Sequence, residues 1–490
     1  MSGSPGYSFR GFSSVNFGLP VSAFGELEVV QPTPTAQASF VFGIDPLQVM
    51  SLGYLPGAGV SGVNGEAVIT CGPAALSYGR MTSRQVTRYR PGQGTMARWT
   101  ARYSPGVAGN RQVAGLSNQE AGYQVGFVDD VFGILYTRTG TVEIVQLTVT
   151  VAPSAPGSVL IVLDGATAVS APVTVSGSTA VCAYQISQAD YSQASGGWAA
   201  QATGSVVTFR RNLAGPAASP STFSANGTGV AAAFSVLTSG VANSEIFIPR
   251  SSWNGTTPNG FDPTKGNVYA VAFQYLGFGN ASFFIEDSAS SQFFLIHSVR
   301  NVNTVTAPVL RNPNLYLTFE SRNTTNTTAV PLVTASAAAF LEGIPGRATS
   351  QFAKTTTKGI LAGPETPVLS LRSDIVFKGR CSTAQIGIAR ISAAADGTKP
   401  VSIQLYKASV PVAAQFSSVG PLSAASVDTQ ATGLSSGVLV FGFVLARTGS
   451  ASEDLIDLEI FLQAGEDFTI TAQSAGASDV SLTVSWTEDI

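Results

Sequence analysis

The alternation of apolar and polar positions along the chain predicts β-strands over most of its length. In the clearest segment, Tyr269, Val271 and Phe273 alternate with smaller residues. A period of two places the aromatic side chains on one face of a strand. Two more strands are predicted directly after it, over residues 281–286 and 292–298, and short turns join the three into an antiparallel meander. Because the aromatic face needs a covering sheet, we predict a β-sandwich centred on this segment.

A β-hairpin is predicted earlier in the chain. Residues 84–90 and residues 96–103 both alternate, and Pro91–Gly94 between them has the proline and glycine placement of a turn. Arginines crowd this hairpin, at Arg84, Arg88, Arg90, Arg98 and Arg102.

These arginines have two interpretations. One is a contact face for an anionic ligand or a neighbouring subunit, with Arg88, Arg90 and Arg98 as the candidate residues. The alternative is a solvated sheet face whose arginines pair with carboxylates such as Asp129 and Asp130. The alternative is favoured, because exposed charges are common on strands and the sequence shows no acceptor motif.

A change in composition indicates an inserted domain. From about residue 152 to 243 the chain is poor in aromatic residues and rich in alanine, serine, glycine, threonine and valine. One helix is predicted over 178–191, with Ser178 as its N-cap. The aromatic pattern then resumes, so we predict a small α+β module over 149–243, inserted into a sandwich made of 41–148 and 244–343. Insertion into a hairpin loop is favoured because the ends of such a loop are close together.

The two ends of the chain are predicted to differ. Residues 1–40 read as a flexible N-terminal arm with spaced phenylalanines, and 344–357 as a linker. Residues 358–490 show strands at regular spacing with glycine turns, as expected of a second, jelly-roll-like sandwich. The predicted fold class is therefore all-β, a concanavalin/laminin-G-like β-sandwich with an inserted α+β module, followed by a jelly-roll-like β-sandwich.

Composition narrows the functional classes. Of 490 residues only 11% are charged, against about 25% in typical soluble domains. An uncharged polar surface is cheap to desolvate, which suits a chain that is packed against neighbours. The net charge is −3 and no basic tract is present, so no nucleic-acid partner is predicted. No signal sequence and no apolar run near the ~20 residues of a membrane span are visible, so we expect a chain made in a cytosol with no membrane span.

Catalytic chemistry is not apparent in the sequence. His297 is the single histidine, and no nucleophile motif accompanies it, so a structural role is predicted. Cys71, Cys182 and Cys381 lie far apart, without zinc spacing, and their odd number argues against a disulfide framework. All three are expected to be buried thiols. We therefore predict no enzyme activity, no cofactor and no metal.

A ligand site in the loops is a weaker expectation. Asp129, Asp130 and Asn267 would line a calcium or sugar site if the first sandwich were lectin-like. The alternative is that these residues serve turns, which is the commoner use of aspartate and asparagine in loops.

Several motifs resemble those of a viral family. They are Arg88–Arg98, Phe132–Tyr136, Asp262–Tyr269 with Leu276–Gly279, and the closing Val484–Asp489. In combination they resemble structural proteins of large DNA viruses of algae and protists, also seen in some phages. The resemblance covers most of 25–343 and, more loosely, 358–490. It implies a component of the virion, and it implies no mechanism.

The leading functional hypothesis is a virion structural protein, as a minor capsid, vertex or fibre subunit. Its partners would be other capsid or virion proteins and further copies of itself in a homo-oligomer, in a virion assembled in the host cytoplasm. The alternative is a carbohydrate-binding receptor-recognition protein of a virion or tail fibre, with a host glycan as partner. A polysaccharide-cleaving enzyme is a third hypothesis, and it needs a pair of carboxylates about 5 to 10 Å apart in a cleft.

Overall fold

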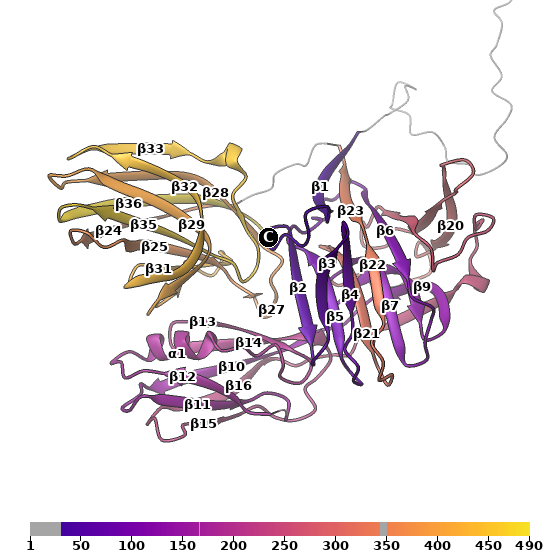
Figure 1. The fold of residues 1–490 in the computed structure, drawn as a ribbon, viewed down its shortest axis with the longest axis horizontal. Helices are drawn as coiled ribbons and strands as arrows, with labels where there is room; N and C mark the ends of the chain where they lie inside the picture. Colours follow the sequence, from indigo (N-terminus) through magenta and orange to yellow (C-terminus); the bar gives the residue numbers. More distant parts are fainter. Residues whose placement is uncertain (1–30, 166, 344–349) are drawn as a thin grey trace, which may run out of the picture.

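The chain folds into three β-rich units. The computed structural model describes residues 31–165, 167–343 and 350–490. We call the units the first sandwich (strands within 32–137 and 245–342), the inserted module (142–238) and the jelly roll (350–489). In Figure 1 the module lies below the two sandwiches, and the chain end marked C lies between those two sandwiches. Among the described residues, no helix combines the length and the hydropathy needed to cross a bilayer.

Two antiparallel sheets build the first sandwich. One sheet has the order β20 (Phe293–Val299), β19 (Ala281–Glu286), β18 (Asn267–Phe273), β6 (Thr95–Tyr103), β22 (Pro331–Thr334), β4 (Glu66–Thr70) and β3 (Gly59–Val63), with β23 (Ser336–Glu342) pairing β6 and β1 (Pro32–Ser39) pairing β23. The other has the order β17 (Glu245–Pro249), β9 (Val131–Thr137), β8 (Gly122–Val128), β7 (Asn110–Ser117), β21 (Tyr316–Asn323), β5 (Tyr78–Ser83) and β2 (Val49–Tyr54). The predicted meander is confirmed as β18-β19-β20.

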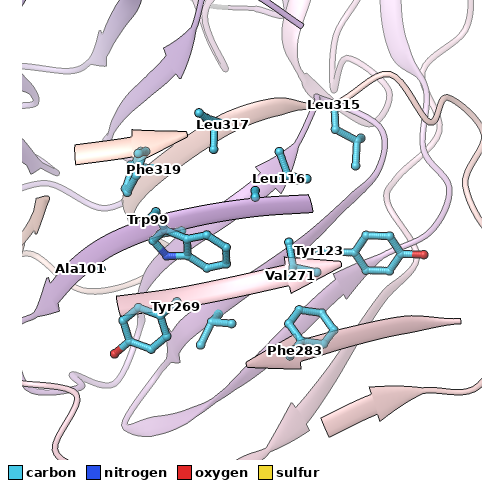
Figure 2. Close-up of a cluster of buried hydrophobic side chains, with 14 of the residues drawn as sticks. Trp99, Ala101, Leu116, Tyr123, Tyr269, Val271, Phe283, Leu315, Leu317 and Phe319 are labelled. Atoms are coloured by element: carbon cyan, nitrogen blue, oxygen red, sulfur yellow. The ribbon is translucent and has the colours of Figure 1, made fainter. Parts of the chain in front are cut away.

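The core lies between these sheets and is aromatic. Trp99 and Tyr269 are stacked neighbours on adjacent strands of one sheet, 5.9 Å apart between ring centroids. Tyr123 of the other sheet meets Phe273 at 5.0 Å and Phe283 at 6.1 Å. Figure 2 shows this layer, in which side chains from both sheets point toward one another. The alternation of the sequence therefore correctly marks the face of β18 that needs a second sheet.

The predicted hairpin of residues 84–103 does not form. Residues 84–90 are irregular apart from one bridge, between Thr87 and Leu315, and only the second half becomes a strand, β6. β6 pairs instead with β18 and β23, two strands that are distant from it in the sequence. The predicted arm also needs correction, since Pro32–Ser39 is strand β1. The rest of that arm, residues 1–30, lies outside the described residues.

The inserted module is an α+β unit, as predicted. Its sheets have the orders β13 (Trp198–Thr203), β14 (Val206–Ala214), β10 (Val142–Val151), β16 (Ala231–Thr238) and β12 (Val169–Val173), β11 (Gly157–Val162), β15 (Thr222–Ser224). Helix α1 (Thr179–Ser187) begins at the predicted N-cap, where Ser178 accepts a hydrogen bond from the Val181 N–H. The module starts earlier than position 149, because β10 pairs with β14 and β16 and not with the first sandwich.

The third unit has the strand order of a jelly roll. One sheet runs β24 (Ser350–Ile360), β36 (Ser478–Asp489), β28 (Gln385–Ala395), β33 (Ser450–Asp454), with β34 (Phe461–Leu462) also on β28. The other runs β30 (Ser417–Ser418), β31 (Ala425–Asp428), β25 (Thr366–Ser373), β35 (Asp467–Ser474), β29 (Val401–Val412), β32 (Gly433–Leu445). A short pair, β26 (Val376–Phe377) and β27 (Arg380–Cys381), lies apart from both sheets.

The long strands of this unit wrap in a regular way. Numbered in chain order as β24, β25, β28, β29, β32, β33, β35 and β36, they form sheets of order 1-8-3-6 and 2-7-4-5. Such nesting of early with late strands is the double Greek key of a jelly roll. The predicted linker is wrong for residues 350–357, since they belong to β24, which pairs with β36 along its whole length. Together, the three units confirm the predicted all-β fold class.

Candidate functional site

The predicted contact arginines lie between the first sandwich and the jelly roll. Arg88 and Arg90 both form ion pairs with Asp489, and Arg88 also donates to the Thr383 carbonyl. Burial lowers the pKa of the Arg88 guanidinium, and Asp489 offsets only part of this. These arginines do pair with a carboxylate, but it belongs to the jelly roll and is neither Asp129 nor Asp130. The expected solvated sheet face is wrong for Arg88, which is buried between two units.

The remaining arginines of the predicted hairpin have other neighbours. Arg84 pairs with Glu466 of the jelly roll at 2.6 Å. Arg98 lies over the ring of Phe293, 5.1 Å from its centroid, in the first sandwich. Among the arginines of the predicted hairpin, Arg84, Arg88 and Arg90 therefore contact the jelly roll. The candidate Arg98 does not, so it lies apart from the candidates Arg88 and Arg90.

The predicted calcium or sugar residues serve turns. Asp129 lies in the tight turn between β8 and β9 with φ = 56°, and its Oδ1 accepts a hydrogen bond from the Gly109 N–H at 2.7 Å. Asn267 uses its Nδ2 to donate to the Asp262 and Lys265 carbonyls, both at 2.8 Å. Asp130 follows Asp129 in the same turn. In the described part of the chain, no group of three or more His, Cys, Asp or Glu residues is placed to hold a metal ion.

His297 and the cysteines have structural surroundings. His297 is buried, and its Nδ1 accepts a hydrogen bond from the Asn254 N–H at 3.2 Å. Burial and the nearby Arg300 lower the pKa of His297, so the ring is neutral at pH 7. All three cysteines are free thiols, with Cys71 and Cys182 buried and Cys381 partly buried.

An unpaired edge of the jelly roll is the most distinctive surface feature. β32 ends its sheet, and no strand of the described residues pairs with its outer edge. Exposed apolar side chains gather on β32 and on β29 beside it, namely Val410, Val412, Val438, Leu439, Val440 and Val444. Val444 is 67% exposed and Leu439 is 52% exposed. Natural proteins usually protect such edges with charges, because free backbone groups recruit another strand.

The composition of β32 offers no such protection. Gly433–Leu445 contains no charged residue. Register shifts disturb its pairing with β29 between Leu405 and Pro411, but residues 441–445 pair regularly with residues 401–405. The sequence predicts strands at regular spacing over 358–490, but no local pattern shows which of them lies at an edge of its sheet. The one available signal was a 13-residue strand without charge.

The jelly roll is held firmly by its neighbours. The module's core cluster includes Ala414, Phe416 and Ala431, which belong to the jelly roll. Arg372 of the jelly roll, in an ion pair with Asp467, lies over the ring of Tyr184 in the module's helix α1, 5.6 Å from its centroid. Together with the Asp489 ion pairs, these contacts join the jelly roll to the module and to the first sandwich.

Comparisons with known proteins concern the architecture only. The carbohydrate recognition domain of Emp46p in its metal-free form is similar at 8% identity, with a TM-score of 0.25, over 63% of this chain and 96% of that one. A legume lectin-like domain from Entamoeba histolytica matches at 8% identity, with a TM-score of 0.26, over 63% and 97%. A triple jelly roll protein of an archaeal virus turret matches at 6% identity, with a TM-score of 0.15, over 91% and 90%. We draw no functional conclusion from likenesses this low.

Sequence comparisons add no family. No protein-family model matches the chain, and no curated protein matches it either. The resemblance to viral structural proteins therefore stays a prediction, and the architecture itself is taken from the sheets described above.

Proposed function

We propose that this protein is a structural component of a virus particle whose copies associate through strand β32. The observation that carries the proposal is the uncharged, apolar and unpaired edge formed by Gly433–Leu445. Backbone donors and acceptors along this edge are satisfied when another strand pairs with them. The exposed valines and leucine beside it leave water in the same step.

The partner that fits this edge is a second copy of the chain. Two copies of β32 in antiparallel pairing present the same apolar residues to each other, so the contact is self-complementary. No charge lies within the strand to oppose this contact, and the whole chain carries only −3. A low overall charge keeps the long-range repulsion between copies small.

The rigid attachment of the jelly roll supports an assembly role. An edge that moved freely would lose more entropy when it is joined to a neighbour. Here the jelly roll is braced on one side by the module and on the other by the Asp489 ion pairs. The low share of charged residues over the whole surface favours the same role, because neutral polar rims desolvate cheaply.

The decisive experiment is to place charges on the edge. Val440→Lys combined with Val444→Lys puts lysines on the free strand, where paired copies would bring like charges together. We expect the unaltered chain to sediment as a dimer or larger species at micromolar concentration, and the double variant as a monomer. Negative-stain microscopy of the unaltered chain would show whether the contacts close or extend.

A matched control separates edge pairing from general solubility. Leu422 is 69% exposed in the same unit but lies in a loop. Leu422→Lys should leave the sedimentation of the chain unchanged. A monomeric unaltered chain, or a double variant that associates as the unaltered chain does, would contradict the proposal.

A further inference from the structure

A second feature, independent of β32, is a pocket at the junction of the three units. Its volume is about 370 Å³, and its floor is the outer face of the sheet that contains β5, β21 and β7. Arg210 and Asn212 of the module line it from one side, and Ser382 and Gln463 of the jelly roll from another. Pockets for small molecules span about 300–1,000 Å³, so this one has room for a small ligand.

Arginines dominate the charge of the pocket. Its charged lining residues are Arg80, Arg84, Arg111, Arg210, Arg322, Glu245 and Glu320. Glu320 forms ion pairs with Arg80 at 2.5 Å and with Arg111 at 2.9 Å, one through each of its carboxylate oxygens. These arginines hold the pKa of Glu320 well below its usual range despite burial, so this carboxylate is ionised and offers no proton at neutral pH. Within the described residues, Arg210 and Arg322 form no ion pair.

The strand register explains why Arg322 has no ion-pair partner among the described residues. Glu320 lies directly opposite Arg80 across β21 and β5, which is a favourable pair. Two residues on, Arg322 lies directly opposite Arg111 across β21 and β7. Like charges in this position destabilise a sheet. Burial and the charges of Arg111 and Arg80 lower the pKa of Arg322, and the nearby Glu320 and Glu245 offset only part of this.

The pocket also has more hydrogen-bond donors than it can satisfy. In the described part of the chain, six buried polar atoms of lining residues have no partner: Arg111 Nε, Arg210 Nε, Arg322 Nε, Thr82 Oγ1, Asn243 Oδ1 and Gln463 Oε1. Three of these atoms can only donate, and the hydroxyl of Thr82 can donate as well. Buried polar groups are nearly always paired in folded proteins. A ligand with a negatively charged acceptor group would satisfy the three arginine Nε atoms, and hydroxyl donors on the same ligand would satisfy the two amide oxygens.

The uncharged lining residues indicate the chemistry of the rest of the ligand. Besides the arginines, the walls carry mainly hydroxyl and amide side chains, among them Ser117, Asn118, Gln124, Asn212 and Thr318. Such groups both donate and accept, which suits a ligand with several hydroxyls. Met50, Leu52 and Leu213 supply a small apolar patch.

We propose that this pocket binds a small hydroxylated ligand that carries one anionic group, such as an acidic monosaccharide. Arg322 and Arg210 hold the carboxylate, sulfate or phosphate, and the amide and hydroxyl side chains bind the hydroxyls. Since residues from all three units line the pocket, the bound ligand also ties the units together.

The test uses calorimetric titration of the full chain with three probes. Glucuronate and glucose differ in one carboxylate, so they isolate the anionic group, while inorganic sulfate isolates the anion without the sugar body. We expect glucuronate to bind and to raise Tm, glucose to bind at least tenfold more weakly, and sulfate to bind more weakly than glucuronate. Equal binding of glucose and glucuronate, no binding of either, or sulfate binding as tightly as glucuronate would overturn the assignment.

Variants locate the site. Arg322→Met should weaken glucuronate binding by about tenfold or more, the usual effect of losing a hydrogen bond to a charged group. Without ligand its Tm should be equal to or above that of the unaltered chain, because the repulsion from Arg111 is removed. Arg210→Met provides a second variant on another unit, and Arg390→Met, on an exposed pair of the jelly roll, is the control that should change nothing. Unchanged affinity in both pocket variants would refute the site.

Discussion

The jelly roll meets the inserted module through an apolar contact and the first sandwich through a charged one. Toward the module, Phe416 lies within the module's own core, and the Tyr184 hydroxyl donates to the Pro411 carbonyl at 2.7 Å. Toward the first sandwich, Arg88 and Arg90 meet Asp489, and Arg84 meets Glu466. The apolar contact gains from burial under most solution conditions, while the ion pairs depend on salt and geometry.

This difference indicates a division of labour between the two contacts. The module contact resembles the interior of one domain, so module and jelly roll are expected to unfold together. The charged contact is weaker, because desolvation offsets most of the attraction in an ion pair. It is, however, specific in orientation, since an arginine must meet a particular carboxylate.

The largest effect is expected from Phe416→Ala. Removing this ring leaves a cavity between two units and should lower the free energy of unfolding by about 3–5 kcal/mol. Urea unfolding followed by fluorescence measures the loss, and limited proteolysis should show earlier cleavage within the module. Leu422→Ala in an exposed loop is the control. A loss below 1 kcal/mol would mean that the module is held by something other than this contact.

A pH dependence should come from Asp374, at the module contact. Its neighbours Ser373 and Ile375 bind Gln201 of the module through their backbones. Burial raises the pKa of Asp374 from 3.8 to about 7, with Glu488 and Asp467 adding to the rise. The folded state therefore holds this proton more tightly than the unfolded state, and stability through this group falls as pH rises from about 4 to about 7.

Asp374→Asn should remove that dependence. We expect the free energy of unfolding to rise by about 1–3 kcal/mol at pH 8 and to change little at pH 4. Urea titrations at the two pH values give the comparison. If the gain were the same at both, titration of Asp374 would not be its cause.

The smallest effect is expected from Asp489→Asn, at the charged contact. Asp489 and Arg90 are each 16% exposed, so we expect a loss of about 1 kcal/mol that shrinks at high salt. Glu66→Gln breaks the exposed pair with Arg102 and should cost less than about 0.5 kcal/mol. A salt-independent loss, or one as large as that of Phe416→Ala, would erase the contrast between the two contacts.

Local sequence patterns were sufficient to predict several of the strands and the helix. The alternation around Tyr269 correctly identified β18 and its buried face, and Ser178 correctly marked the start of α1. Such features depend on residues within a few positions of each other. The predicted strand at 84–90 failed because its alternation was not supported by a neighbouring strand with which to pair.

Sheet pairing and long-range contacts were decided only by the tertiary structure. Asp489, the partner of Arg90, lies 399 positions away, and no local pattern connects the two. The edge position of β32 and the like-charged pair of Arg322 with Arg111 follow from strand order and register in the same way. By itself, the sequence determined strands, one helix and a neutral surface, because these depend on local periodicity and composition. The tertiary structure decided which edges stay free and which charges stay unpaired, because both depend on segments brought together from the whole chain.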